Sequence, residues 1–309
     1  MAEWLYEAGI GEARAALIED GAIVAAAIEP EGTLPVGTMA PARLIDRATG
    51  RVRLADGIEA LLAQTPPRLT EGAGLTVEVT REAIAEAGRV KPARVIVTDA
   101  APRPGPALLD RLAGPPVRRL AAHEPDALEE AGWSELLEEA RTGDIAFPGG
   151  ALRMTPTPAM TLFDVDGAAP LEPLAVRAAV AIGRAVRRHG IAGSIGIDFP
   201  TLAGKAARQA VAAALDAALD PPFERTAMNG FGFLQVVRPR LRASLPELLR
   251  ADPIGAGARA ALRRLEREPP GAPAAHRLPA AVLARLETRP DWLAELARRT
   301  GVTPRLECA

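Results

Sequence analysis

The chain has 309 residues, 48% of them hydrophobic and 25% charged, which is enough for two or three domains with their own cores. Its formal net charge of −2 lacks the basic excess that is usual in nucleic-acid-binding proteins, so contacts with nucleic acid must rely on local basic patches. The single cysteine, Cys308, excludes an internal disulfide and any cysteine-rich zinc site within one chain.

The sequence also argues against a membrane protein. Its apolar runs fall well short of the ~18 residues that a membrane-spanning helix needs. Residues 1–7 contain acidic side chains and lack the basic start of a secretory signal peptide. We therefore expect a cytoplasmic protein without a membrane partner.

The first part of the chain predicts β-structure. Trp4–Ala8, Ala13–Ile18 and Ala22–Ile28 are candidate strands, and Asp20-Gly21 between the last two is a typical hairpin turn. A second β-rich block follows, and its size of about sixty residues is that of a small barrel such as an OB-fold. Its candidate strands are 43–46, 51–55 and 75–79.

Beyond this block the pattern changes to alternating strands and helices. The β-branched run Ala93–Thr98 is typical of a buried strand. Helices are expected at 107–112 and 124–141, and two or three more after residue 251. Between them, strands and helices alternate in the order that predicts an α/β layer. The alternating elements are strand 159–165, helix 171–189, strand 194–199, helix 204–219 and strand 232–237.

Two aspartates, Asp164 and Asp198, each follow an apolar strand of this layer. One helix-length segment separates the strands, and a right-handed crossover would bring their ends together. Magnesium is commonly held by one or two carboxylates, with water and phosphate oxygens completing its shell. Asp166 points to the same side as Asp164 if the strand continues, as a third ligand or a hydrogen-bonding neighbour. The alternative is that each aspartate only caps a turn or helix.

Two groups of arginines are candidates for phosphate contacts. Arg184 and Arg188 lie on one side of the expected helix 171–189, where a basic stripe could hold a phosphate backbone or form an ordinary solvated face. Arg238 and Arg240 alternate along residues 237–242 and would project from one side of an extended chain, either to phosphate or in a structural role. The nearby Gly230-Phe231-Gly232 is interpreted as a tight turn before a strand.

The chain resembles the catalytic region of the ribonuclease E/G family in four blocks of sequence whose order and spacing match. The blocks are Phe147-Pro-Gly-Gly150, 162–166, 193–199 and 230–241. The resemblance implies that Asp164 and Asp198 hold a catalytic Mg²⁺ or Mn²⁺.

The resemblance also implies a fold and a domain organisation. The fold would be α/β (α+β), with RNase H-like and DNase I-like layers and an inserted small β-barrel of OB type. Residues 1–33 with 93–142 would form the RNase H-like part, and 34–92 an RNA-binding OB-fold insert. Residues 143–250 would form the catalytic DNase I-like part, and 251–309 a small C-terminal domain.

The sequence departs from the family pattern in several places. There is no room for the segment that senses a 5′-monophosphate, and the paired cysteines that bridge two chains through zinc are missing after Leu248. We therefore expect no zinc, and a monomer or weak homodimer. Residues 34–92 contain no aromatic side chain, although single-stranded RNA binders usually stack bases on such side chains. Asp166 stands where the family has Asn, and Gly230 where it has a basic residue.

The leading hypothesis is a Mg²⁺-dependent endoribonuclease that cleaves single-stranded RNA during RNA processing or decay. Asp164 and Asp198 would bind the metal, and Asp166 would orient its water shell. Arg238, Arg240, Arg184 and Arg188 would contact the RNA backbone. The alternatives are a non-catalytic RNA-binding factor that keeps the fold, and a metal-dependent phosphoesterase that acts on small molecules.

Overall fold

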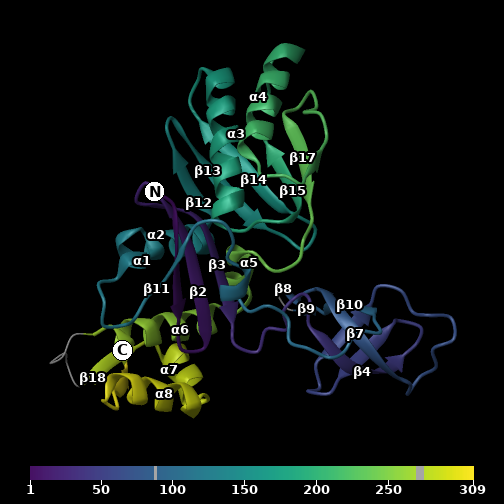
Figure 1. Ribbon diagram of the computed structural model, residues 1–309. Helices are drawn as coiled ribbons and strands as arrows, with labels where there is room; N and C mark the ends of the chain where they lie inside the picture. The colour runs from purple at the N-terminus through teal and green to yellow at the C-terminus, as the bar shows by residue number, and fades with distance from the viewer. Residues whose placement is uncertain (87–88, 269–274) are drawn as a thin grey trace.

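The structure is a computed structural model that describes residues 1–86, 89–268 and 275–309. The chain is mixed α/β and contains a four-stranded sheet, a closed five-stranded barrel, a six-stranded sheet and a C-terminal group of helices (Figure 1). Each of these four parts has its own cluster of buried apolar side chains. None of the helices in the described ranges is long and apolar enough to span a membrane.

The four-stranded sheet has the order β11-β1-β2-β3, and the expected hairpin turn at Asp20-Gly21 lies between β2 and β3. Its strands are β1 (Glu3–Ala8), β2 (Glu12–Glu19), β3 (Ala22–Pro30) and β11 (Val117–Arg119). Helices α1 (Ala127–Glu130) and α2 (Trp133–Thr142) bury Leu128, Trp133 and Leu136 against it. The helical pattern predicted at 124–141 is confirmed over most of its length, but as two helices, because Gly132 has φ +93° and separates them.

The barrel is closed in the order β10-β6-β5-β4-β7. Its strands are β4 (Met39–Asp46), β5 (Arg51–Leu54), β6 (Glu59–Leu62), β7 (Gly74–Arg81) and β10 (Ala93–Val97). Strand β10 pairs with β6 and β7, so the barrel extends beyond the boundary at residue 92 that the sequence predicted. Strands β8 (Ile84–Glu86) and β9 (Arg89–Lys91) form a separate small hairpin beside it.

The barrel stands to one side of the other parts in Figure 1. The chain enters and leaves it at one place, where the amides of Met39 and Arg103 each donate to the other residue's carbonyl at 2.9 Å. The segment after the barrel was expected to be helical at 107–112, but only the short 3₁₀ turn η1 (Leu109–Arg111) forms there.

The six-stranded sheet has the order β12-β13-β14-β15-β17-β16. Only β14 and β15 are parallel neighbours, and helix α3 connects them. Helices α3 and α4 lie together on one face of the sheet (Figure 1). The strands are β12 (Asp144–Phe147), β13 (Gly150–Pro156), β14 (Thr161–Gly167), β15 (Gly193–Asp198), β16 (Glu224–Arg225) and β17 (Phe233–Arg238). The helices are α3 (Leu171–Arg188) and α4 (Lys205–Ala218).

The C-terminal part is mainly helical, as expected, but it also contains a two-stranded parallel sheet that was not predicted. Its elements are α6 (Pro253–Glu266), β18 (Ala275–Leu278), α7 (Ala280–Glu287), α8 (Pro290–Thr300) and β19 (Arg305–Cys308). The preceding helix α5 (Leu245–Ala251) packs Leu245 into the core of the four-stranded sheet.

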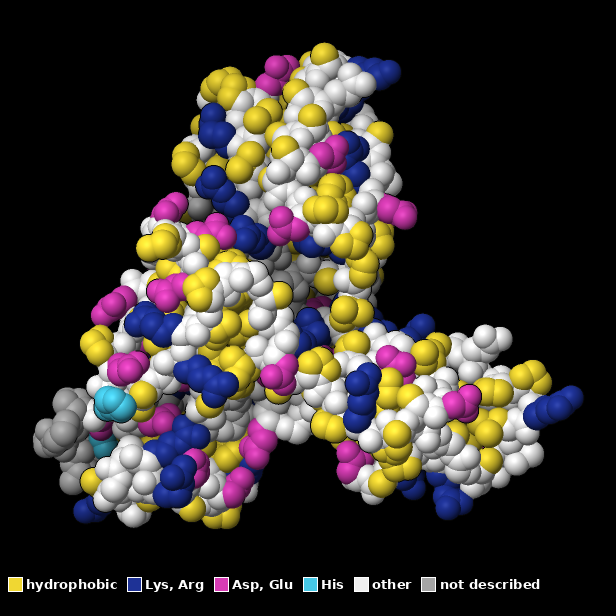
Figure 2. Space-filling view, in the orientation of Figure 1, with side chains coloured by type: hydrophobic (Ala, Val, Ile, Leu, Met, Phe, Trp, Pro, Cys, Tyr) yellow, Lys and Arg dark blue, Asp and Glu magenta, His cyan; other side chains and the backbone are white. Residues whose placement is uncertain are grey.

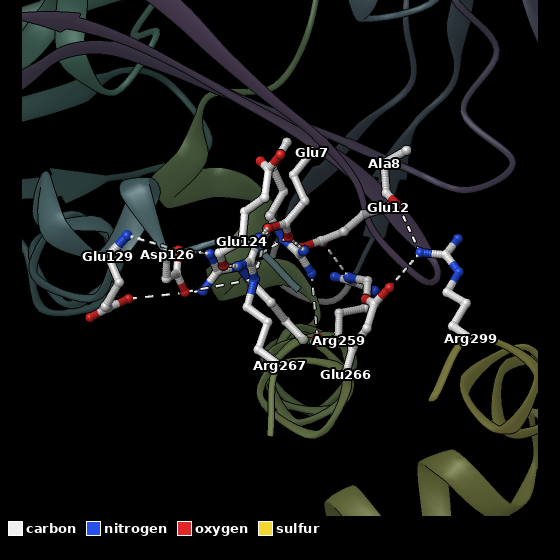
Figure 3. Close-up of polar contacts among 12 residues, drawn as sticks. Glu7, Ala8, Glu12, Glu124, Asp126, Glu129, Arg259, Glu266, Arg267 and Arg299 are labelled. Carbon is white, nitrogen blue, oxygen red and sulfur yellow. Dashed lines mark hydrogen bonds and ion pairs between the residues drawn. The ribbon is translucent and has the colours of Figure 1, made fainter. Parts of the chain in front are cut away.

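A buried group of charged side chains joins α6 to the four-stranded sheet (Figure 3). We call it the Glu7 network, and it consists of Glu7, Glu12, Arg14, Asp126, Arg259, Arg263 and Arg267. Glu7 accepts from Arg14, from Arg263 Nε at 3.0 Å and from Arg267 Nη2 at 2.5 Å. Each of the three carboxylates in this network is paired with arginines. The network therefore holds α6 to the sheet, and its own carboxylates are not available to a cation.

Candidate metal centre

Strand β14 separates polar from apolar side chains by simple alternation. Thr161, Phe163 and Val165 are buried, whereas Leu162, Asp164 and Asp166 are exposed. Phe163 and Val165 belong to the same core as the inner side of α3. Since successive side chains of a strand point to opposite faces, Asp164 and Asp166 lie on the face of the sheet that α3 and α4 do not cover.

Asp164 and Asp198 are direct cross-strand neighbours. They are paired in the register of the parallel strands β14 and β15, and both are exposed. Neighbouring strands lie about 4.8 Å apart, so two carboxylates on the same face can reach one cation with ligand distances of about 2.1 Å. The residues present therefore fit a Mg²⁺ or Mn²⁺ site, and they come from the two strands that the sequence indicated.

Asp166 lies farther along the same face. It is two residues beyond Asp164 on β14 and pairs with Ala151 of β13. In residues 1–86, 89–268 and 275–309, no three His, Cys, Asp or Glu side chains converge as a metal-binding group. A cation at Asp164 and Asp198 would therefore take its other ligands from water and from substrate oxygens.

An arginine that the sequence did not indicate completes this exposed row. Arg153 of β13 is the register partner of Asp164, and Asp144 of β12 is the partner of Arg153. Arg153 Nη2 lies 3.2 Å from Asp144 Oδ1, and both side chains are more than half exposed, at 64% and 60%. The row thus runs across four strands in the order Asp144, Arg153, Asp164 and Asp198. It places the guanidinium group of Arg153 beside the acidic pair.

The arginines predicted on helix α3 lie elsewhere. Arg184 and Arg188 are on the helix that packs against the opposite face of the sheet (Figure 1). Arg188 donates through Nη2 to Glu139 Oε2 at 2.5 Å, whereas Arg184 is exposed. The structure does not bring these arginines to the aspartates, because the sheet lies between them.

Arg238 and Arg240 are also distant from the aspartates. Arg238 pairs with Gly193 at the start of β15, whereas Asp198 at its end pairs with Phe233. Five residues separate the two ends, which corresponds to roughly 17 Å along a strand. The alternation of arginines in residues 237–242 predicts that Arg238 and Arg240 project from one side of the chain. It does not predict at which end of the sheet the two arginines lie.

Both arginines also have internal partners. Arg238 Nη2 donates to the carbonyl of Asp220 at 3.0 Å, and Arg240 pairs with Glu247 of α5. Partial burial lowers the pKa of the Arg238 guanidinium, and the charge of Asp220 opposes this effect. Of the two roles that the sequence allows for Arg238 and Arg240, phosphate contact or a structural role, these contacts support the structural role.

The glycine-containing turn before β17 adjoins the aspartates. Phe199, the residue after Asp198, donates its amide to the carbonyl of Gly232 at 3.2 Å. Gly232 has φ +98°, and a Cβ there would lie 2.1 Å from the carbonyl oxygen of Phe199. The turn therefore requires glycine at this position, as a tight turn before a strand implies.

Comparisons with known proteins do not identify a relative: no family model matches the chain, and no curated protein matches it.

Proposed function

We propose that this chain is a metal-dependent endoribonuclease of the ribonuclease E/G type that cleaves single-stranded RNA. The observation that carries the proposal is the in-register pair Asp164 and Asp198 on an exposed sheet face. Mg²⁺ or Mn²⁺ bound there would activate a water molecule and stabilise the charge that develops on the phosphodiester. The products would carry 5′-phosphate and 3′-hydroxyl ends.

The side chains of this row would then have distinct tasks. Asp164 and Asp198 would hold the cation, and Asp166 would orient its water shell from the same strand. Arg153 is the register partner of Asp164 and would bind a non-bridging phosphate oxygen, a contact for which guanidinium groups are well suited. This assignment replaces Arg184, Arg188, Arg238 and Arg240 as the phosphate ligands nearest the metal.

Within this proposal, the four-stranded sheet with α1 and α2 is the RNase H-like part, and the barrel is an OB-fold that holds RNA. The six-stranded sheet with α3 and α4 is the DNase I-like part. We further propose a cytoplasmic protein that acts as a monomer or weak homodimer. The closed barrel and the exposed aspartate pair support this assignment.

A second candidate is an RNA-binding factor that retains this fold without catalysis. It is favoured by the internal pairing of Arg188, Arg238 and Arg240 and by the lack of aromatic residues in 34–92. On the face that Figure 2 shows, basic and acidic side chains are interspersed, so no broad basic stripe is available on that side. Such a factor would bind RNA without requiring a metal.

Cleavage of a single-stranded RNA with Mg²⁺ tests the proposed function. Asp164→Asn and Asp198→Asn should each lower the rate by about two orders of magnitude or more, because a carboxylate ligand is lost. Asp20→Asn is a matched control at the exposed turn between β2 and β3, outside the barrel, where asparagine tolerates the φ of +51° as well as aspartate does. This control should cleave at the wild-type rate.

Metal binding separates the candidates. Calorimetry with Mn²⁺ should detect one site in the wild type and in Asp20→Asn, and none in the two site variants. Equal cleavage rates in all four proteins would overturn the assigned site. RNA binding without cleavage or metal uptake would favour the non-catalytic factor, and activity only on small phosphodiesters would exclude RNA as the substrate.

A further inference from the structure

One aromatic side chain stands out from the rest of the chain. Phe231 is 82% exposed, whereas every other Phe, Tyr and Trp, all of which the structure describes, is buried or partly buried. Burying a phenylalanine contributes about 1.5–3 kcal/mol to folding, so an exposed one contributes little to stability. Its position therefore calls for an explanation other than core packing.

The backbone around Phe231 is held firmly. Asn229 Oδ1 accepts from the amides of Phe231 at 2.9 Å and Phe233 at 3.0 Å. Thr201 donates its hydroxyl to the carbonyl of Phe231 at 3.3 Å. Together with the close approach of Gly232 to Phe199, these contacts fix the turn. A ring presented by a fixed turn loses little backbone entropy when it binds a ligand.

The turn that carries Phe231 adjoins Asp198. Phe233, two residues after Phe231, is the register partner of Asp198. On the same face, Phe233 approaches Gly196 so closely that a Cβ there would lie 2.9 Å from Cζ, and Leu162 and Met160 lie equally close. The acidic pair thus has an apolar border formed by Phe233 and Leu162. The solvent-exposed Phe231 stands two residues before Phe233 in the adjoining turn.

We propose that Phe231 is a positioning residue that stacks on a nucleobase of single-stranded RNA while the neighbouring phosphodiester lies at Asp164 and Asp198. The inference rests on the proposed function and adds the contact that would hold the strand. A flat ring beside a charged row suits a ligand that has both a base and a phosphate. The barrel block 34–92 has no aromatic residue to supply such stacking.

Binding without cleavage tests this proposal. Fluorescence anisotropy in EDTA would compare a labelled decamer RNA with an abasic strand of the same length. Every protein in the comparison would also carry Asp164→Asn and Asp198→Asn, so that no bare carboxylate repels the phosphodiester. Phe231→Ala should weaken binding to the RNA by about 5-fold to 100-fold, the range expected for one stacked base, and leave abasic binding unchanged. Phe231→Trp should restore the affinity, whereas Phe231→Leu should not.

Val302→Ala is the control, because Val302 is 63% exposed and belongs to the C-terminal part. Equal affinities of wild type and Phe231→Ala for the RNA would overturn the proposal, as would full rescue by Leu. A change of mass in solution caused by Phe231→Ala would instead assign the ring to contact with a second copy. RNA binding is measured here without metal, so the result does not depend on cleavage at the aspartates. If the proposed cleavage activity proved wrong, the binding test of Phe231 would still be valid.

Discussion

At the scale of single residues, the Glu7 network is the most heavily buried charge cluster of the molecule. Arg14 is only 1% exposed and Glu7 only 5%. Burial alone would raise the pKa of Glu7, but Arg14, Arg263 and Arg267 outweigh this effect and hold the pKa below its ordinary value. The carboxylate therefore stays charged because three guanidinium groups surround it.

Glu7→Gln should destabilise the fold strongly. The substitution leaves buried guanidinium groups without their counter-charge, and removing one partner of a buried pair typically lowers the free energy of unfolding by about 3–5 kcal/mol. Urea unfolding followed by circular dichroism measures the change. Glu138→Gln is the control, because the Glu138–Arg141 pair is 58% and 63% exposed and should contribute little to the free energy of unfolding. Similar losses in both variants would contradict this account.

At the scale of secondary-structure elements, α3 and α4 approach each other closely at Gly183. A Cβ at this position would lie 2.5 Å from Cβ and 2.6 Å from the carbonyl oxygen of Ala218. The glycine therefore permits the two helices to cover the sheet together. If α3 and α4 could not approach each other in this way, they would pack less well against the face of the sheet opposite Asp164 and Asp198.

Gly183→Ala should destabilise the protein although alanine is the better helix former. Propensity alone would stabilise the helix by about 1 kcal/mol, but overpacking against a backbone carbonyl typically costs about 1–3 kcal/mol or more. The expected result is a lower midpoint of thermal unfolding together with weaker metal binding at the aspartates. A raised midpoint would show that the helices separate without strain.

Elements with strong local patterns could be predicted from the sequence. Strands β14 and β15 and helix α3 follow from runs of apolar residues and from helical periodicity, and so does the pairing of Asp164 with Asp198. The short strands β6, β11 and β16 have only four, three and two residues, too few for a pattern of their own. In addition, β11 is held by β1, a partner distant in the sequence. The barrel boundary was wrong for the same reason, since only pairing with β6 and β7 assigns β10 to the barrel.

The functional row was only partly predictable. Arg153 could not be recognised, because its place beside Asp164 depends on the register of an antiparallel pair. Arg238 and Arg240 were grouped with the aspartates, although they lie at the opposite end of β15. Phe231 was interpreted only as part of a turn, because exposure cannot be read from three residues of sequence.

At the scale of the whole molecule, the Glu7 network links stability to pH. Burial would raise the pKa of Asp126, but hydrogen bonds from Arg263 and from the amide of Glu129 lower it, as the arginines lower that of Glu7. A carboxyl group whose pKa is lower in the folded state stabilises the protein above its unfolded pKa. That contribution is lost as the pH falls through the folded value.

The urea midpoint of the wild type should therefore fall as the pH decreases below the ordinary values of 4.5 for Glu7 and 3.8 for Asp126. In Glu7→Gln this fall should be shallower, because one of the groups that bind protons on unfolding is absent. Midpoints measured from pH 7 to pH 3 test the difference. Parallel curves for both proteins would mean that Glu7 does not contribute to the acid sensitivity.

The Glu7 network also constrains the order in which the chain folds. Glu7 and Arg263 are 256 positions apart in the sequence. The hairpins of β1 to β3 close over short loops, and Arg14 can pair there with Glu7 and Glu12. The excess negative charge of these two carboxylates is balanced only after α6 has been synthesised and has docked. Contacts over such separations slow folding. During translation, Glu7 and Glu12 must therefore stay partly hydrated on the first strands, so the docking of α6 is a late step that completes the native state.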